Sequence, residues 1–170
     1  DKIVLEPDAM NMSTFFYKEA DRDLLKAGPL WDYDRAFGEA VSNYNLSIGD
    51  YPNSMREWYM ELYGNDDFKE KMISYYKELL FYFDEMLDSG IDEYVNYISD
   101  SVKMDGTRWP LEYYNTEMTS YLEYESYVKY LKYFIANRLN YLNEVWGISE
   151  WQFEVPKSEN IEHQVKFYMD

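Results

Sequence analysis

The feature that most constrains the fold is the stretch from Ser13 to Gly38, STFFYKEADRDLLKAGPLWDYDRAFG. Two apolar runs, Ser13–Lys18 and Leu24–Trp31, flank a short charged segment. Runs rich in aromatic residues and Thr around a polar turn predict a β-hairpin. Gly28 and Pro29 interrupt the second run, and because proline has no N–H to donate, they predict an edge or bulged position there.

Two carboxylates directly follow the second predicted strand. Asp32 and Asp34 lie two positions apart, and in an extended segment such side chains point the same way. Carboxylate oxygens are the ligands that hard cations such as Mg²⁺ prefer. An Asp-x-Asp pair after a strand is more often a solvated turn or a helix start than a metal site. The spacing alone therefore does not establish a metal site.

The complete string favours the metal site. STFFYK, a short polar turn and AGPLWDYDRAFG closely resemble the central segment of the spore-coat CotH kinase family, a divergent, protein-kinase-like group found in bacteria. The resemblance continues more loosely to about Trp146. It implies a mainly α fold with an N-terminal β-hairpin, similar to the C-terminal lobe of a protein kinase. It also implies transfer of a phosphoryl group from Mg-ATP to Ser or Thr hydroxyls of a protein substrate.

The resemblance implies roles for three acidic residues. Asp32 would be a Mg²⁺ ligand, and Asp34 would be a second ligand or would orient the first. Asp8 would accept or orient the substrate hydroxyl, because the catalytic Asp of a protein kinase precedes a strand pair and the metal-binding Asp follows it. Asp8 also follows Pro7, where an Asp is equally typical of a turn.

Asn11 and Arg35 complete the set of candidate site residues. Protein kinases place an Asn metal ligand in the catalytic loop. Ser13 and Thr14 occupy the position just before the first predicted strand, so Asn11, two residues earlier, is the remaining candidate metal ligand. Arg35 either faces a phosphate of the nucleotide or forms an ion pair with a neighbouring carboxylate.

Charge and residue usage exclude several classes of function. The chain has 33 Asp and Glu against 16 Lys and Arg, a formal net charge of −17, so nucleic acid and anionic membranes are not expected partners. With 20 Tyr, 9 Phe and 5 Trp it has the apolar side chains that a folded core needs. It has no Cys, and its single His is His163, which excludes disulfides, thiol catalysis and multi-histidine metal sites within this chain. No segment approaches the roughly 20 apolar residues of a membrane span.

Four or five helices are predicted between about residues 52 and 147. The first, around 55–63, stops at Gly64, and a longer one begins after an Asn65 or Asp66 cap and stops before Gly90. Apolar residues of the longer helix at helical spacing are expected to face the core: Phe68, Met72, Tyr75, Leu79, Tyr82, Phe83 and Met86.

Two more helices follow in the prediction. One spans 91–104 and stops at the turn signal Asp105–Gly106. The other spans 119–146 and stops at Gly147. Its expected core residues also have helical spacing: Leu122, Tyr127, Leu131, Phe134, Ile135, Leu139, Leu142 and Trp146.

The end of the chain changes in character. Apolar and polar residues alternate from Trp151 to Val155 and again near the C-terminus, which predicts strands. We therefore expect residues 1–155 to be the C-terminal part of a CotH kinase-like domain, with the hairpin at 13–31, the acidic segment at 32–38 and helices at about 52–147. Residues 156–170 are expected to be a linker and the start of a β module.

The chain contains neither a glycine-rich loop nor a Lys on an obvious strand for nucleotide phosphates. By the resemblance, those parts are expected upstream of Asp1, so this chain alone is expected to be inactive, and the protein is expected in the extracellular space, on a cell surface or on a spore coat. The alternative is a non-catalytic helical scaffold or binding module of a secreted bacterial multidomain protein. The many Tyr residues and the acidity support that alternative, since Tyr serves both packing and ligand stacking.

Overall fold

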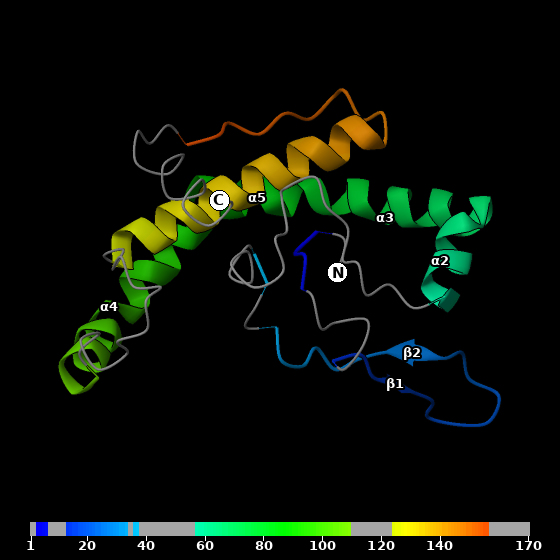
Figure 1. Cartoon of the computed structure of the whole chain (residues 1–170), viewed down its shortest axis with the longest axis horizontal. Helices are drawn as coiled ribbons and strands as arrows, with labels where there is room; N and C mark the ends of the chain where they lie inside the picture. Colours follow the sequence, from blue (N-terminus) through cyan, green and yellow to red (C-terminus); the bar gives the residue numbers. More distant parts are fainter. Residues whose placement is uncertain (1–2, 7–12, 34–35, 38–56, 110–123, 157–170) are drawn as a thin grey trace.

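The computed structural model describes residues 3–6, 13–33, 36–37, 57–109 and 124–156 (Figure 1). In these ranges the protein is mainly helical, with a two-stranded antiparallel hairpin near the N-terminus. Figure 1 shows the helices forming one layer, with the hairpin on one side of it. The predicted combination of helices and an N-terminal hairpin is therefore confirmed, whereas the similarity to a kinase lobe remains a prediction.

The hairpin is shorter than the sequence predicts. Strand β1 (Phe16–Tyr17) pairs with β2 (Lys26–Ala27), with Phe16 opposite Ala27. The Gly28 N–H donates to the Phe15 carbonyl at 3.0 Å, and a cis peptide bond joins Gly28 to Pro29. Pairing ends here because Pro29 has no N–H to continue the ladder.

The first two helices begin and end close to where the sequence predicts. Helix α2 spans Glu57–Gly64 and α3 spans Asp66–Glu85. Asn65 separates them and is the N-cap of α3, since its Oδ1 accepts a hydrogen bond from the Phe68 N–H at 2.9 Å. This bond satisfies one of the four N–H groups that a helix start leaves without a partner.

Replacing Asn65 by Ala should lower the free energy of unfolding by about 1 kcal/mol, because the cap is lost while the exposed site leaves no cavity. Asn65→Ser, which keeps a capping oxygen, is the matched control and should cost only a few tenths of that. Urea denaturation followed by circular dichroism measures both. Equal losses in the two variants would show that the cap contributes nothing.

The predicted break between α3 and the next helix is wrong. A π-helical turn, η1 (Met86–Gly90), joins α3 directly to α4 (Ile91–Arg108), and the Ile91 N–H donates to the Met86 carbonyl. Gly90 has right-handed helical angles, φ −60° and ψ −40°, so it continues the helix instead of ending it. Asp105 and Gly106 also lie within α4 and form no turn.

Helix α5 (Tyr124–Val145) contributes more buried residues to the core than any other described element. Of its predicted core residues, Phe134, Ile135, Leu139 and Leu142 are buried, whereas Tyr127 is exposed and Leu122 lies outside the described residues. Gly147 ends the helix as predicted. With φ +67° it lets its own N–H reach the Glu144 carbonyl at 3.2 Å and the Ile148 N–H reach the Asn143 carbonyl at 2.8 Å, the Schellman arrangement.

The predicted core face of α3 is displaced by about one residue. Phe83 and Met86 pack against the core as predicted. The other side chains that pack there are Ile73, Tyr76, Leu80 and Leu87, and both Met86 and Leu87 belong to η1. Tyr75, Leu79 and Tyr82 are exposed, with 67%, 43% and 65% of their surface accessible. Apolar residues thus cover two adjacent faces of α3, and only one of them is packed against other helices.

The alternating segment after α5 is extended but is not a strand. Residues 151–156 run back along α5 (Figure 1), with Phe153 buried. Asn140 exchanges two hydrogen bonds of 2.9 Å with the backbone N–H and carbonyl of Phe153, and Asn143 Nδ2 donates to the Trp151 carbonyl at 3.0 Å. The Asn140 and Asn143 side chains of α5 therefore supply the backbone hydrogen bonds that a neighbouring strand would otherwise make.

The same Asn143 also connects α5 to α3. The Tyr76 hydroxyl donates to Asn143 Oδ1 at 2.9 Å, and the Tyr76 ring meets the edge of Trp146 at 4.8 Å. Burial raises the pKa of Tyr76 above its ordinary value of 10.0, and Arg138 only partly opposes this shift. The folded state therefore holds the phenol proton at a pH where the unfolded chain has lost it.

This shift predicts that the protein loses stability above about pH 10, because the unfolded chain then binds fewer protons than the folded one. The contribution of Tyr76 is complete below pH 10 and declines above it. Tyr76→Phe should flatten the decline in the free energy of unfolding between about pH 9 and 11. The exposed neighbour Tyr75, changed to Phe, is the control. An unchanged slope in Tyr76→Phe would contradict the assignment.

Candidate functional site

Asp32 is the predicted site residue that the structure describes. It follows the hairpin, its side chain is exposed, and its backbone φ is +60°, in the left-handed region. Asp tolerates this region better than most residues do, because its short side chain can bond locally. Before it, Trp31 meets Phe15 edge to face at 6.2 Å, which fixes the end of the hairpin. Asp32 thus presents a solvent-accessible carboxylate from the irregular segment after the hairpin.

A backbone contact joins the segments on either side of the hairpin. The Phe37 N–H donates to the Val4 carbonyl at 2.7 Å, and the Phe37 ring lies edge-on against Phe134 of α5 at 6.5 Å. Phe37 and Leu5 both have positive φ angles, +59° and +54°. Left-handed conformations of non-glycine residues carry a cost and are often found at functional sites. This contact fixes both segments to the core helix.

The hydrogen bond between Val4 and Phe37 lies close in sequence to two of the predicted acids. Val4 is four positions before Asp8, and Phe37 is three positions after Asp34. Whether these two acids meet in one site stays a prediction.

Glu6 is a buried acid that the sequence analysis did not identify. Its side chain is completely buried, and its negative charge contributes to raising the pKa of Tyr33, after burial and after Tyr59. Arg138 of α5 is also completely buried and lies 5.4 Å from the centre of the Tyr141 ring. A Glu after three apolar residues and an Arg within an amphipathic helix carry no sequence signal that would distinguish them from surface charges.

Asp8, Asn11, Asp34 and Arg35 lie outside the described residues. Their convergence with Asp32 therefore stays a prediction. In the part of the chain that the structure describes, no group of three acidic or His side chains is arranged to hold a metal ion. Of the predicted metal ligands, Asp32 is the one that the structure describes, and its exposed carboxylate is an oxygen donor of the kind that a hard cation takes.

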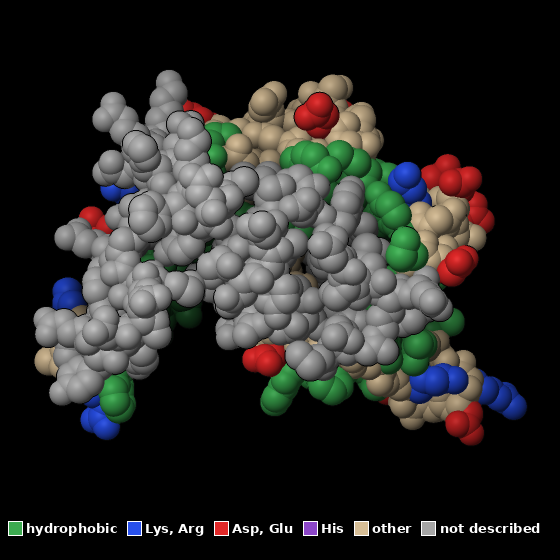
Figure 2. Space-filling view, in the orientation of Figure 1, with side chains coloured by type: hydrophobic (Ala, Val, Ile, Leu, Met, Phe, Trp, Pro, Cys, Tyr) green, Lys and Arg blue, Asp and Glu red, His purple; other side chains and the backbone are tan. Residues whose placement is uncertain are grey.

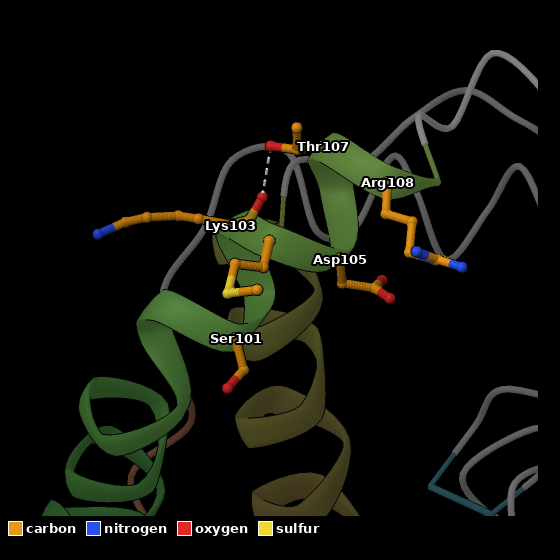
Figure 3. Close-up of a pocket in the computed structure, with 6 residues that line it drawn as sticks. Ser101, Lys103, Asp105, Thr107 and Arg108 are labelled. Atoms are coloured by element: carbon orange, nitrogen blue, oxygen red, sulfur yellow. Dashed lines mark hydrogen bonds between the residues drawn. The ribbon is translucent and has the colours of Figure 1, made fainter.

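An open hollow of about 610 Å³ lies elsewhere, at the end of α4 (Figure 3). The side chains that line it point in different directions. Thr107 donates to the Lys103 carbonyl at 2.8 Å, Lys103 pairs with Asp100, and Arg108 covers the Trp109 ring. These polar groups do not converge on a common point, so we assign no chemistry to this hollow.

The surface of the hairpin combines apolar and charged side chains. Figure 2 shows hydrophobic side chains beside Lys, Arg, Asp and Glu at the lower edge of the molecule, where Figure 1 places the hairpin. The most exposed of its large hydrophobic residues are Leu24 and Leu30, both more than four-fifths accessible. No described helix combines the length and the apolar character needed to cross a lipid bilayer.

Comparison with protein-family models identifies the relationship. Residues 2–142 match the model of the CotH kinase protein family. The chain belongs to the CotH kinase family. The match includes the hairpin, α2 to α4 and most of α5, and it confirms the relationship inferred from the string around Asp32. Neither a curated protein nor a solved structure matches the chain.

The match ends inside α5, before the extended segment at 151–156. That segment is nevertheless part of the folded unit, since Phe153 is buried and bonded to Asn140. The folded unit of this CotH kinase family member therefore extends beyond the matched residues.

Proposed function

We propose that this chain supplies the metal-binding part of an atypical protein kinase that transfers the γ-phosphoryl group of ATP to Ser or Thr hydroxyls of a protein. The observation that carries the proposal is the exposed carboxylate of Asp32, which has a left-handed backbone and directly follows the hairpin, in a member of the CotH kinase family. Phosphoryl transfer depends mainly on positioning and charge neutralisation, so acidic metal ligands are its central requirement.

The roles proposed for the side chains follow the family. Asp32 and Asp34 would bind Mg²⁺, with Asn11 as a further ligand, and a bound Mg²⁺ would neutralise phosphate charge. Asp8 would accept or orient the proton of the attacking hydroxyl, and Arg35 would face a nucleotide phosphate. The anchor between Val4 and Phe37 supports this proposal, because it fixes the chain on both sides of the hairpin to α5.

Calorimetric titration with Mg-ATP tests the proposal. The titrations would use the 170-residue chain and the full-length protein, meaning the natural protein that includes these residues, each with and without Asp32→Ala. We expect tight Mg-ATP binding by the full-length protein, weak binding by the chain alone, and loss of affinity with Asp32→Ala. Binding by the full-length protein that is unaffected by Asp32→Ala would refute the assignment.

The family also indicates a location outside the cell, on its surface or on a spore coat, and this location belongs to the proposal. Burial of Asp32 and Asp34 in hydrogen bonds to helix N-termini would favour the rival function, a non-catalytic scaffold or binding module, and their convergence with Asp8 on a cleft would favour the kinase. Asp32 is exposed, and Asp8 and Asp34 lie outside the described residues, so the titration with Mg-ATP decides between the two functions.

A further inference from the structure

The outward-facing side of α3 combines exposed aromatic and acidic side chains. We define this outer face of α3 as Tyr75, Glu78, Leu79, Phe81, Tyr82 and Glu85, all of which are exposed. The side of α3 that carries Tyr76 and Leu80 is buried in the core. A contiguous exposed apolar surface on a folded protein is typical of an interaction site.

The charged side chains from the middle of α3 into α4 are all acidic. From Glu78 to Asp100 there are seven acids and no Lys or Arg. Asp92 pairs with Lys132 at 2.7 Å and Asp100 with Lys103 at 3.2 Å, and Lys77 is held by Glu150 at 3.5 Å. Glu78 and Glu85, on the outer face, have no such described partner. The bases nearest to this face in sequence are Lys71, four residues before Tyr75, and Lys77, four residues before Phe81.

Acidic and aromatic groups alternate on this face at helical spacing. Glu78 is three residues before Phe81 and four before Tyr82, and Glu85 is four after Phe81 and three after Tyr82, so each ring lies between two carboxylates. The two rings meet edge to face at 5.9 Å. A guanidinium or ammonium group placed there would meet an aromatic face and a carboxylate together.

Cation–aromatic contacts of this kind already occur within the protein. Lys69 lies 5.3 Å from the centre of the Tyr63 ring, and Arg108 lies 5.2 Å from that of Trp109. On the outer face of α3 the aromatic and acidic groups are present, and no Lys or Arg of the described residues makes such a contact with them.

We propose that the outer face of α3 binds a Lys- or Arg-rich segment of a partner protein. Charge selects this occupant. A second copy of the chain would bring another net charge of −17 to an acidic face, and an anionic membrane would also be repelled. The proposal does not depend on the phosphotransferase function.

Binding of an acetylated hexa-arginine amide to the 170-residue chain tests it, at about 150 mM salt so that distant charges are screened. Phe81→Ser/Tyr82→Ser keeps the net charge and should weaken binding about tenfold, since two cation–aromatic contacts are lost. Leu24→Ser/Leu25→Ser removes an equally exposed apolar pair from the hairpin and should change the affinity less than about twofold.

A second pair of variants separates local from overall charge. Glu78→Gln/Glu85→Gln should weaken binding about fivefold, whereas Glu61→Gln/Glu70→Gln, which removes the same charge from exposed sites elsewhere, should have less than half that effect. Equal losses in the two pairs would show that overall charge alone attracts the peptide, and the proposal would fail. Sedimentation showing a dimer that Phe81→Ser/Tyr82→Ser dissociates would also overturn it, by assigning the face to a second copy.

Discussion

Replacing Asp32 by Asn should reduce phosphoryl transfer by the full-length protein by about 100-fold or more, because a neutral amide binds Mg²⁺ far more weakly than a carboxylate does and transition-state charge would be left without compensation. The side chain is exposed, so the change should leave folding intact. Initial rates with saturating ATP and several Mg²⁺ concentrations measure the effect, which higher Mg²⁺ should partly restore.

Asp23→Asn is the matched control for this prediction. Asp23 lies in the turn of the same hairpin, nine positions before Asp32. Its replacement removes one negative charge, as Asp32→Asn does. The rate of phosphoryl transfer should stay within about twofold of that of the unmodified protein, since distant surface charges are screened by salt. If the two variants behave alike, Asp32 is not a metal ligand.

Leu139→Ala should have the largest effect on stability, about 3 kcal/mol of the free energy of unfolding, because it leaves a cavity in the core. Leu139 is completely buried. The core cluster around it contains residues of α3 and α5, Leu5 before the hairpin, and Phe153 after α5. Urea denaturation measures the loss. Val145→Ala, at an exposed position of the same helix, should cost less than about 0.5 kcal/mol. A loss below about 1 kcal/mol for Leu139→Ala would mean that α5 is not the centre of the core.

Local patterns predicted the elements whose hydrogen bonds are local. The hairpin, the Asn65 cap and the Gly147 stop all depend on residues within a few positions of each other. Gly90 was misjudged because a π-helical turn supplies an alternative hydrogen bond, so the chain stays helical where the glycine suggested a stop.

Patterns that depend on distant partners were less informative. Helix α3 is apolar on two adjacent faces, and only the position of α5 decides that Tyr76 is buried and Tyr75 is not. The alternation from Trp151 to Val155 correctly indicated an extended chain, but its partners, Asn140 and Asn143, are side chains of a helix and not a strand.

The candidate site was predicted through resemblance more than through physical reasoning. Spacing alone left Asp32 and Asp34 open to a plain turn, and the string around them indicated the family that the match over residues 2–142 confirms. Glu6 was missed because complete burial of a charged side chain depends on tertiary packing that no short pattern encodes.

The most direct measurement of the central claim is the transfer of labelled γ-phosphate from ATP to a Ser-containing protein by the full-length protein, with Mg²⁺ present and after its removal with EDTA. The proposal predicts labelled phosphoserine only with Mg²⁺, and its loss in Asp32→Asn but not in Asp23→Asn. Transfer that continues without divalent metal, or no transfer at all with Mg²⁺ and nucleotide in excess, would contradict it.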